Sequence, residues 1–378
     1  MTLSRRHFIA GTSSLTLLGS PLFNARAAKL EKRNLVIIML RGGMDGLTAV
    51  PVHDGLLDKA RPDIQVEGLL NLNSDFSLHP KLKYFHKLWR EKRASIVHAT
   101  NIPYQLRSHF DGQDLMESGG HVPYKERTGW LGRGIKAAEL QGLALSLPMP
   151  LLLRGSERPD NYYPTGLRMP PPEMLEKIAQ SYHADEELAA VMQSIQMRPR
   201  SMMVNSGRDP EQLARQAARQ LAKDDGPRIA VFDIGGFDTH AAQGGADGQH
   251  GEKLQDFDRV LRNLSDGLGS ALDNTLILTL TEFGRKIEQN GGYGTEHGYG
   301  TAILMAGGLV KKPQIYTDWP GLKRKDLFEG QDLMATIDAR SVYCSAMASC
   351  FQVDFDYLRN QAFFGDPLMD LTDNLFQI

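Results

Sequence analysis

NLVIIMLRGGMDG, residues 34–46, is the stretch that decides the fold. We expect the first strand at residues 34–40, because its apolar run is typical of a strand buried on both faces of a parallel sheet. The run then breaks into a turn with three glycines, which lets the backbone change direction and presents Asp45 above the strand end. Asp45 is therefore either a site carboxylate or the cap of a following helix.

Four more apolar runs predict strands of the same sheet: residues 95–99, 229–234, 275–280 and 301–306. Between the second and third of these runs, Leu254, Phe257, Leu261, Leu264 and Leu268 recur at helical spacing. A strand, a helix and a further strand in succession form a β-α-β unit of a parallel sheet. The pattern predicts an α/β fold with a mostly parallel central sheet and helices on both faces.

Polar side chains capable of binding a metal follow or precede these runs. Ligand crevices of open α/β sheets lie outside the carboxyl ends of the strands, so such residues converge there from distant parts of the sequence. Asp238 and His240 lie two apart in an extended segment, which turns both toward one side and permits both to reach one cation. The expected metal ligands are Asp45, Asp238, His240, Glu282 and His297.

Ser108 stands where a helix is expected to begin. With Asp111 three residues later it forms something like a capping box. The same position suits a nucleophile or a phosphate-sized oxyanion, because a helix N-terminus attracts negative charge. Both interpretations stay open. Arg41, Arg107 and Arg285 are candidates to bind the non-bridging oxygens of a substrate.

The size and charge of the chain narrow the function classes. A length of 378 residues fits one large α/β domain or two smaller ones. The charged fraction of 23% is ordinary for a soluble chain, and the net charge of −2 comes with no basic stripe. We therefore expect no nucleic-acid partner.

The first residues resemble an export signal. Arg5 and Arg6 precede a modest apolar stretch at 8–23, and small residues follow at 25–27. The stretch is too short and too polar for a stable membrane span. We expect residues 1–27 to be a twin-arginine signal peptide, the twin-arginine translocase to be a partner during export, and the mature domain, 28–378, to be periplasmic or exported.

Two further features concern the mature chain. Residues 154–225 combine a loop rich in Gly and Pro with helical patterns at 185–196 and 210–223, and predict a cap or lid inserted over the sheet. Cys344 and Cys350 form no metal or disulfide motif, so we expect both to be small buried apolar residues.

Five motifs together resemble a bacterial family, domain of unknown function 1501, over nearly the whole mature chain: RGGMDGL, RSHFDGQDLMESG, FDIGGFDTH, TEFGR and GTEHG. That family is similar in sheet and motif order to the alkaline phosphatase and sulfatase superfamily. The resemblance implies an alkaline-phosphatase-like three-layer sandwich and two metal ions beside a nucleophile.

The resemblance also implies roles for single residues. Asp45 resembles the first metal carboxylate, Ser108 the nucleophile, and Asp238 with His240 the ligand pair of the second metal, while Glu282 and His297 resemble the remaining ligands. The chain departs from the superfamily in two ways, because Phe283 stands where a ligand histidine is usual and the pair at 238 and 240 is more tightly spaced. His250 and Glu296 are candidate replacements.

These observations favour an exported, metal-dependent hydrolase of small-molecule or polymeric phosphate or sulfate esters, with Ser108 as nucleophile. One or two divalent ions are expected, without a choice among Zn²⁺, Mn²⁺, Mg²⁺ and Ca²⁺. An exported binding or scaffold protein that retains the fold without catalysis is the alternative, and Phe283 favours it. Metal-free serine hydrolysis, with His109 or His98 as the base, is a third reading.

Overall fold

The computed structural model describes residues 31–146, 149–157, 159–161, 171–182, 185, 188–189, 192 and 209–377. The expected signal peptide and most of the expected helix at 185–196 lie outside these residues. Residues 34–378 form a unit of their own, and the account below concerns that unit.

A nine-stranded sheet forms its centre, with the order β12-β4-β11-β8-β1-β7-β5-β6 and β13 beside β4. The strands are β1 (Asn34–Leu40), β4 (Ala94–Asn101), β5 (Gly142–Ala144), β6 (Asp160–Asn161), β7 (Ile229–Ile234), β8 (Thr275–Leu280), β11 (Thr301–Ala306), β12 (Ile315–Tyr316) and β13 (Ile337–Asp338). All five expected strands are present, and four have the expected bounds. Two small sheets pair β2 (Leu70–Asn71) with β3 (Ser77–Leu78) and β9 (Arg285–Gln289) with β10 (Thr295–His297).

The direction of the strands decides where their ends meet. β1 lies between β7 and β8 and is parallel to both, with Leu40 opposite Ile234 and Met39 opposite Leu280. β11 is antiparallel to both of its neighbours, β4 and β8. The start of β11 therefore lies at the same edge as the carboxyl ends of β1, β7 and β8. This geometry confirms a mostly parallel sheet.

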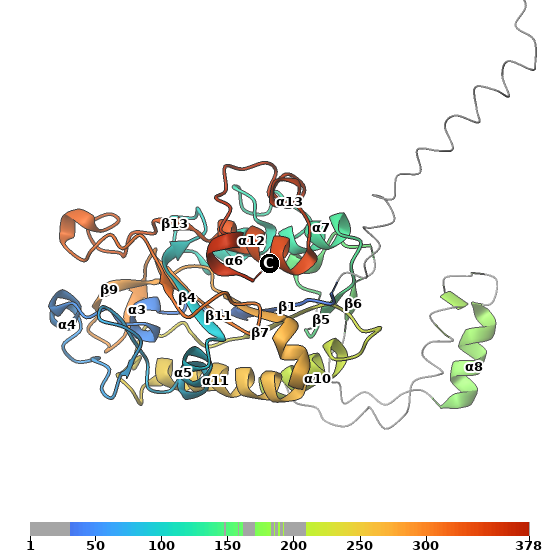
Figure 1. Cartoon of the computed structure of the whole chain (residues 1–378), viewed down its shortest axis with the longest axis horizontal. Helices are drawn as coiled ribbons and strands as arrows, with labels where there is room; N and C mark the ends of the chain where they lie inside the picture. Colours follow the sequence, from blue (N-terminus) through green and yellow to red (C-terminus); the bar gives the residue numbers. More distant parts are fainter. Residues whose placement is uncertain are drawn as a thin grey trace, which may run out of the picture. The chain divides into compact units, whose positions relative to one another are not determined.

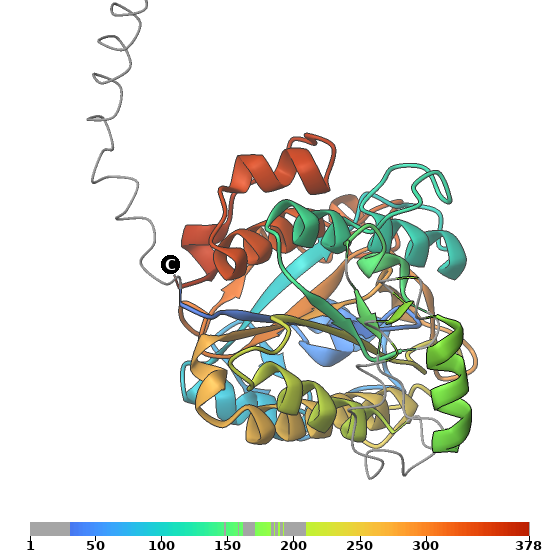
Figure 2. The same cartoon turned by 90° about the vertical axis from the view of Figure 1, so that its right-hand side faces the viewer.

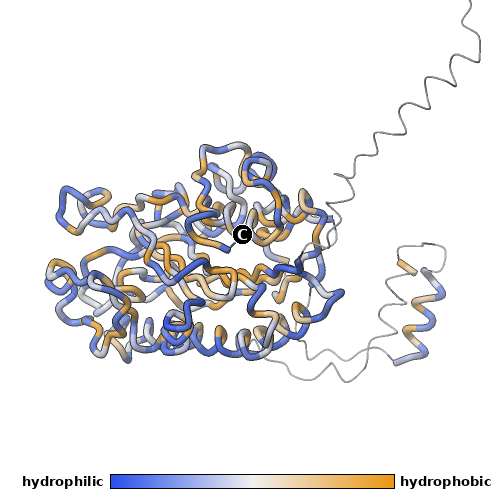
Figure 3. Tube along the Cα trace, viewed as in Figure 1, coloured by the Kyte–Doolittle hydropathy of each residue, from blue (hydrophilic) through white to orange (hydrophobic). Residues whose placement is uncertain are grey.

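Helices cover both faces of the sheet (Figures 1 and 2). One layer contains α5 (Lys83–Arg90), α10 (Pro210–Leu221) and α11 (Gln249–Leu268), and the other contains α6 (His109–Ser118), α7 (Trp130–Ala137), α12 (Ala339–Phe351), α13 (Phe355–Ala362) and α14 (Thr372–Leu375). The strands are coloured mostly hydrophobic in Figure 3, as expected for a sheet between two layers. The α/β three-layer arrangement is confirmed.

The alternation of side chains along β1 builds a separate core on each face. Leu35, Ile37 and Met39 pack with α7 and α12, whereas Val36 and Ile38 pack with α10 and α11. Successive residues of a strand point to opposite faces, so one apolar run supplies both cores.

The remaining helices are α3 (Gly46–Ala49), α4 (Gly55–Ala60) and α8 (Pro172–Ser181), with 3₁₀ turns at Leu151–Leu153, Gly269–Asn274 and Arg324–Asp326. Part of the expected cap, α10, packs into the core through Leu213, Ala217 and Leu221. Both cysteines are buried free thiols. None of the described helices combines the length and hydrophobicity needed to cross a bilayer.

Candidate metal centre

The carboxyl ends of β1 and β7 approach each other so closely that only glycine fits between them. Gly42 has a φ of +117°, and a Cβ at this position would lie 2.4 Å from the backbone nitrogen of Asp238. Backbone of this kind is accessible to glycine and rarely to other residues. The glycine turn after β1 therefore brings the loop that follows β7, with Asp238 and His240, to the edge where β8 also ends.

Four side chains converge at this edge: His109, Asp238, His240 and His297. Oδ1 of Asp238 lies 3.0 Å from Nε2 of His240 and 3.1 Å from Nε2 of His297. The two Nε2 atoms are 2.9 Å apart. Nε2 of His109 lies 3.2 Å from Oδ2 of Asp238. One ligand atom each of His109, Asp238 and His297 falls within 4.8 Å of the others, so these residues could hold a metal ion.

Each of the three imidazoles has an acceptor at its other nitrogen. Nδ1 of His297 lies 2.8 Å from the carbonyl oxygen of Arg107, Nδ1 of His240 lies 2.9 Å from Glu296, and Nδ1 of His109 lies 2.8 Å from Glu282. A carbonyl oxygen can only accept, so His297 donates from Nδ1 and its neutral form has a lone pair on Nε2. Glu296 and Glu282 lie at Nδ1 of His240 and His109 in the same way, while Asp238 lies near Nε2 of both rings.

The donor set fits a transition-metal ion. Three imidazole nitrogens and a carboxylate are ligands that Zn²⁺ accepts. The contacts of 2.9–3.2 Å within the cluster are shorter than the roughly 3.3–3.6 Å between the ligand atoms of a tetrahedral zinc site, so the side chains would move slightly apart around an ion. Nε2 of His109 is buried and forms no well-aligned hydrogen bond among the described residues, although Oδ2 of Asp238 lies 3.2 Å away. Acceptors at the second nitrogen are the usual support of metal-binding histidines.

The charges of the centre shift the pKa values of its members. Burial favours a raised pKa for Asp238, but the hydrogen bond from the Arg285 guanidinium lowers it below its ordinary range. The hydrogen bond to Glu282 raises the pKa of His109, although burial opposes this shift. Burial lowers the pKa of His297, which favours the neutral ring that a metal requires.

Glu282 contacts the candidate centre through a hydrogen bond with His109. Its side chain is fully buried, and Oε1 accepts hydrogen bonds from His109 at 2.8 Å, Gln113 at 2.9 Å and the backbone of Gly42 at 2.9 Å. Burial favours a raised pKa for Glu282, but the hydrogen bonds from His109 and Gln113 lower it. The structure thus places this predicted ligand as the hydrogen-bond partner of His109, a member of the candidate centre.

Asp45 lies in a different contact network. It caps α3, accepting from the backbone nitrogens of Leu47 and Thr48. Its Oδ2 accepts from Arg61 at 2.7 Å and from Gln243 at 2.7 Å, and both partners of the ion pair are buried. Because these donors occupy its oxygens, Asp45 is not brought together with the other predicted ligands. The helix-cap interpretation describes its position.

Ser108 lies between two residues of the centre. Arg107 supplies the carbonyl that orients His297, and His109 supplies its ring. Ser108 is the N-cap residue of α6, but its side chain makes no capping hydrogen bond to the helix. Its backbone nitrogen donates to the hydroxyl of Tyr104 at 3.0 Å. The predicted nucleophile is thus a sequence neighbour of residues that build the cluster, and its side chain does not cap the helix.

The three candidate substrate-binding arginines have protein partners. Arg285 is buried and donates to the carbonyl of Phe237 at 2.9 Å and to Asp238 at 2.7 Å, besides the carbonyls of Gly42 and Gly43. It therefore ties the loops after β1 and β7 together. Arg107 pairs with Glu329 and Asp332, and Arg41 pairs with Glu117.

Phe283 fills space beside the centre. Its ring is buried, with its centroid 4.9 Å from that of His109 and 4.8 Å from that of His297. A Cβ at Gly43 would lie 2.7 Å from this ring. The residue that departs from the superfamily pattern thus packs against two of the converging imidazoles.

The sequence interpretation missed His109 as a member of the metal centre. His109 and Gln113 are four residues apart in α6, which places both on one helix face, and both contact Glu282. That spacing was the available signal.

His109 has a carboxylate near each ring nitrogen, and His98 is buried with its nitrogens bonded to Val50 and Ala99. These contacts disfavour both as bases for Ser108. His250 is buried against Phe237 rather than in the centre, whereas Glu296 contacts His240.

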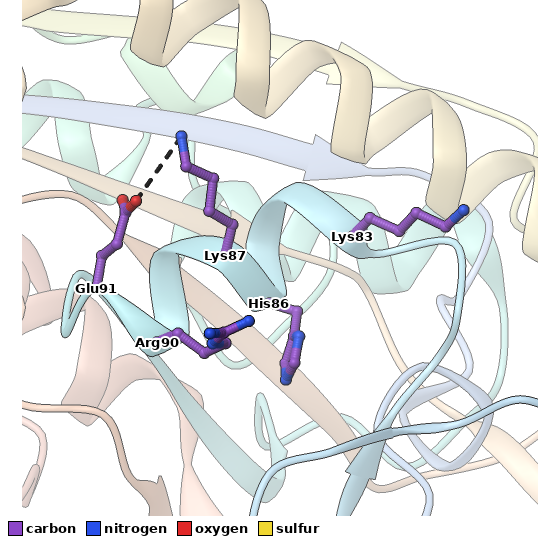
Figure 4. Close-up of a pocket in the computed structure, with 5 residues that line it drawn as sticks. All are labelled: Lys83, His86, Lys87, Arg90 and Glu91. Carbon is purple, nitrogen blue, oxygen red and sulfur yellow. Dashed lines mark ion pairs between the residues drawn. The ribbon is translucent and has the colours of Figure 1, made fainter.

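A groove along α5 contains none of the predicted site residues (Figure 4). It is lined by Lys83, His86, Lys87, Arg90 and Glu91. Lys87 and Glu91 point toward each other and form an ion pair of 3.8 Å, whereas Lys83 extends away from them. The groove lacks the converging donors of the metal centre.

Several solved structures are similar to this chain, whereas a search of curated proteins returns no match. Murine ectonucleotide pyrophosphatase/phosphodiesterase 5 is 11% identical, with a TM-score of 0.47 and coverage of 91% of this chain and 100% of that chain. Ps i-CgsB in complex with k-i-k-neocarrahexaose is 11% identical, with a TM-score of 0.45 and coverage of 91% and 76%. A protein of the alkaline phosphatase superfamily from Vibrio parahaemolyticus is 13% identical, with a TM-score of 0.37 and coverage of 75% and 62%.

The sequence itself matches a family model over most of its length. The model is that of the protein of unknown function DUF1501, and it covers residues 94–344. This range includes all four converging side chains, together with Ser108 and Glu282. As its motifs predicted, the chain belongs to the DUF1501 family of proteins of unknown function.

Proposed function

We propose that this protein is an exported hydrolase of phosphate or sulfate esters that uses one divalent metal ion. His109, Asp238, His240 and His297 would hold the ion. The observation that carries the proposal is the pair of Nε2 atoms of His240 and His297, 2.9 Å apart, with an acceptor at the Nδ1 atom of each ring. Two facing lone pairs repel each other, so a cation between them stabilises the arrangement.

A single ion is favoured over two. Asp45, a candidate ligand of another ion, is paired with Arg61, and Glu282 accepts from His109. Three imidazoles and one carboxylate suit Zn²⁺ or Mn²⁺ better than Mg²⁺ or Ca²⁺, which prefer oxygen ligands. When bound, such an ion would need to accept an ester oxygen in addition to the four protein groups, and would then withdraw charge from that oxygen and favour attack on phosphorus or sulfur.

Ser108 is the proposed nucleophile. It begins α6, whose ten residues present a positive dipole end to an alkoxide. In the first step the Ser108 oxygen bonds to phosphorus or sulfur, the ester bond breaks, and the alcohol leaves with a proton. Water then cleaves the serine ester and releases phosphate or sulfate. Arg285 holds Asp238 in place throughout, since its guanidinium is buried against that carboxylate.

Export through the twin-arginine route is part of the proposal, supported by Arg5 and Arg6 ahead of a modest apolar stretch. Fractionation of cells that express the full chain tests it, with a variant that carries Arg5→Lys and Arg6→Lys as the comparison. We expect the unaltered chain in the exported fraction and the variant inside the cell. Equal distribution of the two would contradict export by this route.

Elemental analysis and ester hydrolysis test the catalytic part together. We expect about one metal ion per chain, loss of that ion in His297→Ala, and hydrolysis of an aryl phosphate or an aryl sulfate by the metal-loaded protein alone. His86→Ala, at a partly exposed histidine of α5 outside the candidate centre, is the matched control and should keep the metal. A metal content unchanged in His297→Ala would refute the site.

A binding protein without turnover is the second candidate. The observation that favours it is Phe283, which packs against His109 and His297. If the protein only binds its ligand, it should contain metal but hydrolyse neither phosphate nor sulfate esters with Zn²⁺, Mn²⁺, Mg²⁺ or Ca²⁺. Hydrolysis lost in His297→Ala would exclude it.

A further inference from the structure

The entrance of α6 carries large apolar side chains that face solvent. Leu106 is 73% exposed, Phe110 80%, Val122 53% and Tyr124 57%. We call these four residues the apolar rim. Single exposed apolar residues are ordinary, but several together mark binding surfaces more often than the rest of a protein surface does.

Two residues of the apolar rim, Phe110 and Tyr124, lie on the same side of α6. The backbone nitrogen of Tyr124 donates to Oδ1 of Asp114 at 2.8 Å, so the segment around Tyr124 lies beside α6. Phe110 and Asp114 are four residues apart in this helix and share a face. Tyr124 is thereby held on the side of the helix that presents Phe110.

Leu106 and Phe110 of the apolar rim are sequence neighbours of residues that contact the candidate centre. Leu106 immediately precedes Arg107, whose carbonyl orients His297, and Phe110 immediately follows His109. Ser108 lies between them. Adjacent Cα atoms are 3.8 Å apart, so the backbone of Leu106 lies next to that of Arg107 and the backbone of Phe110 lies next to that of His109.

The charges around the rim indicate an uncharged occupant. Asp111 and Asp114 lie on α6 beside it, and Lys125 and Arg127 follow Tyr124. Surfaces that bind anionic bilayers are enriched in Lys and Arg. Here acidic and basic side chains are both present, which disfavours binding to an anionic membrane. An uncharged apolar group matches this surface better.

We propose that the apolar rim binds an apolar ring carried by the ester on which the centre acts. This inference rests on the proposed function, since the phosphate or sulfate would lie at the metal centre and the ring against Phe110 and Tyr124. Aromatic side chains favour flat apolar partners through offset or edge-on packing. The substrate class is thus an organic ester with an aryl or benzyl group rather than a small polar one.

Binding of two inert analogues tests the inference without requiring turnover. Benzylphosphonate and methylphosphonate share the charged group and differ in the ring, and their C–P bond is not an ester. Titration calorimetry of the Zn²⁺-loaded protein should show about tenfold tighter binding of benzylphosphonate. In Leu106→Ala/Phe110→Ala the two dissociation constants should become equal, with metal content unchanged. Met369→Ala, exposed elsewhere, should keep the ratio.

The outcomes separate the inference from the proposed function. Equal affinities in the unaltered protein, with ester hydrolysis present, would overturn the inference alone. A retained tenfold ratio without hydrolysis would overturn the hydrolase proposal and leave the rim supported. Binding of neither phosphonate would overturn both. Two further results would also overturn the inference. If the unaltered protein sediments with phosphatidylcholine vesicles and Leu106→Ala/Phe110→Ala does not, the rim binds a bilayer. If the unaltered protein self-associates and this variant does not, the rim binds a second copy of the chain.

Discussion

His240 and His297 direct their Nε2 atoms at each other across 2.9 Å, while Glu296 and the carbonyl of Arg107 occupy the opposite side of each ring. The two rings come from different segments, because His240 lies in the loop after β7 and His297 is the last residue of β10. Such an arrangement is stable when a cation or a proton lies between the nitrogens. The predictions below follow from this relationship and from the contacts that support it.

Removal of Glu296 should weaken metal binding without unfolding the protein. Its carboxylate orients His240 from a half-exposed position, and loss of such a partner usually lowers metal affinity about 10- to 100-fold. Competition with a chelating dye measures the affinity of Glu296→Ala for Zn²⁺. Glu288→Ala, an exposed carboxylate on β9, should bind as tightly as the unaltered protein. Equal affinity in both variants would contradict the role of Glu296.

Replacement of Arg285 by lysine should destabilise the fold. Lysine is unable to reproduce the donations to Asp238 and to the carbonyls of Phe237 and Gly43, so buried acceptors lose their partners. Each unsatisfied buried group costs about 1–3 kcal/mol, and we expect a total loss of about 3 kcal/mol or more. Urea unfolding gives the value. A loss below about 1 kcal/mol would show that other contacts hold these loops.

The ion pair of Asp45 with Arg61 predicts a non-additive double variant. Arg61→Met leaves a buried, unpaired carboxylate and should cost about 3–5 kcal/mol. Addition of Asp45→Asn removes that charge and should restore part of the loss. Arg262→Met breaks a pair that is exposed on both sides and should cost at most about 1 kcal/mol. A double variant no more stable than Arg61→Met would contradict this account.

Ser108→Ala should abolish ester hydrolysis and leave the metal in place. Removal of a covalent nucleophile typically lowers kcat at least about a thousandfold. Kinetics with an aryl ester and elemental analysis of the same sample measure both quantities. Ser74→Ala, an exposed serine far along the chain, is the control. Hydrolysis by Ser108→Ala at an unaltered rate would assign the attack to water rather than to this serine.

His98 should make the fold less stable in acid. Burial lowers the pKa of His98 to about 4, while in the unfolded chain the pKa is about 6.5. Between these values the unfolded state binds more protons, so stability is complete above about pH 6.5 and falls as the pH falls toward 4. His98 alone should account for a loss of about 2 kcal/mol between pH 7 and pH 5.

Urea unfolding of His98→Gln at both pH values measures this contribution. The difference between pH 7 and pH 5 should shrink by about 2 kcal/mol relative to the unaltered protein. His86→Gln, at the surface, should leave the difference unchanged. Burial also lowers the pKa of His79 to about 4 and that of His250 to about 3, so a smaller pH dependence should remain.

Much of the architecture was predictable from residues alone. The runs at 34–40, 229–234, 275–280 and 301–306 became strands with the expected bounds, because continuous apolar stretches between turns have few other stable environments. Asp238, His240 and His297 were expected to converge because they border such runs, and they do. The family was likewise recognisable from five short motifs.

Long-range partners were not predictable in the same way. Asp45 and Asp238 each follow a strand, but Asp45 pairs with Arg61 and Asp238 lies among imidazoles. The difference depends on which donor the fold brings near, and α4 delivers Arg61 from 16 residues downstream. The role of Arg285 was not predictable for the same reason. The sequence does not distinguish an arginine that binds substrate from one that donates to backbone carbonyl groups of its own chain.

The residues by themselves determined the strands, the parallel sheet and the edge at which polar side chains gather, since these depend on local hydrophobic pattern and on the direction of the chain. Only the tertiary structure decided that His109 belongs to the candidate metal centre, that Asp45 lies outside it, and that Glu282 accepts a hydrogen bond from His109. Hydrogen bonds and ion pairs act over a few ångströms, so the role of each polar group follows from its neighbours in space rather than from its neighbours along the chain.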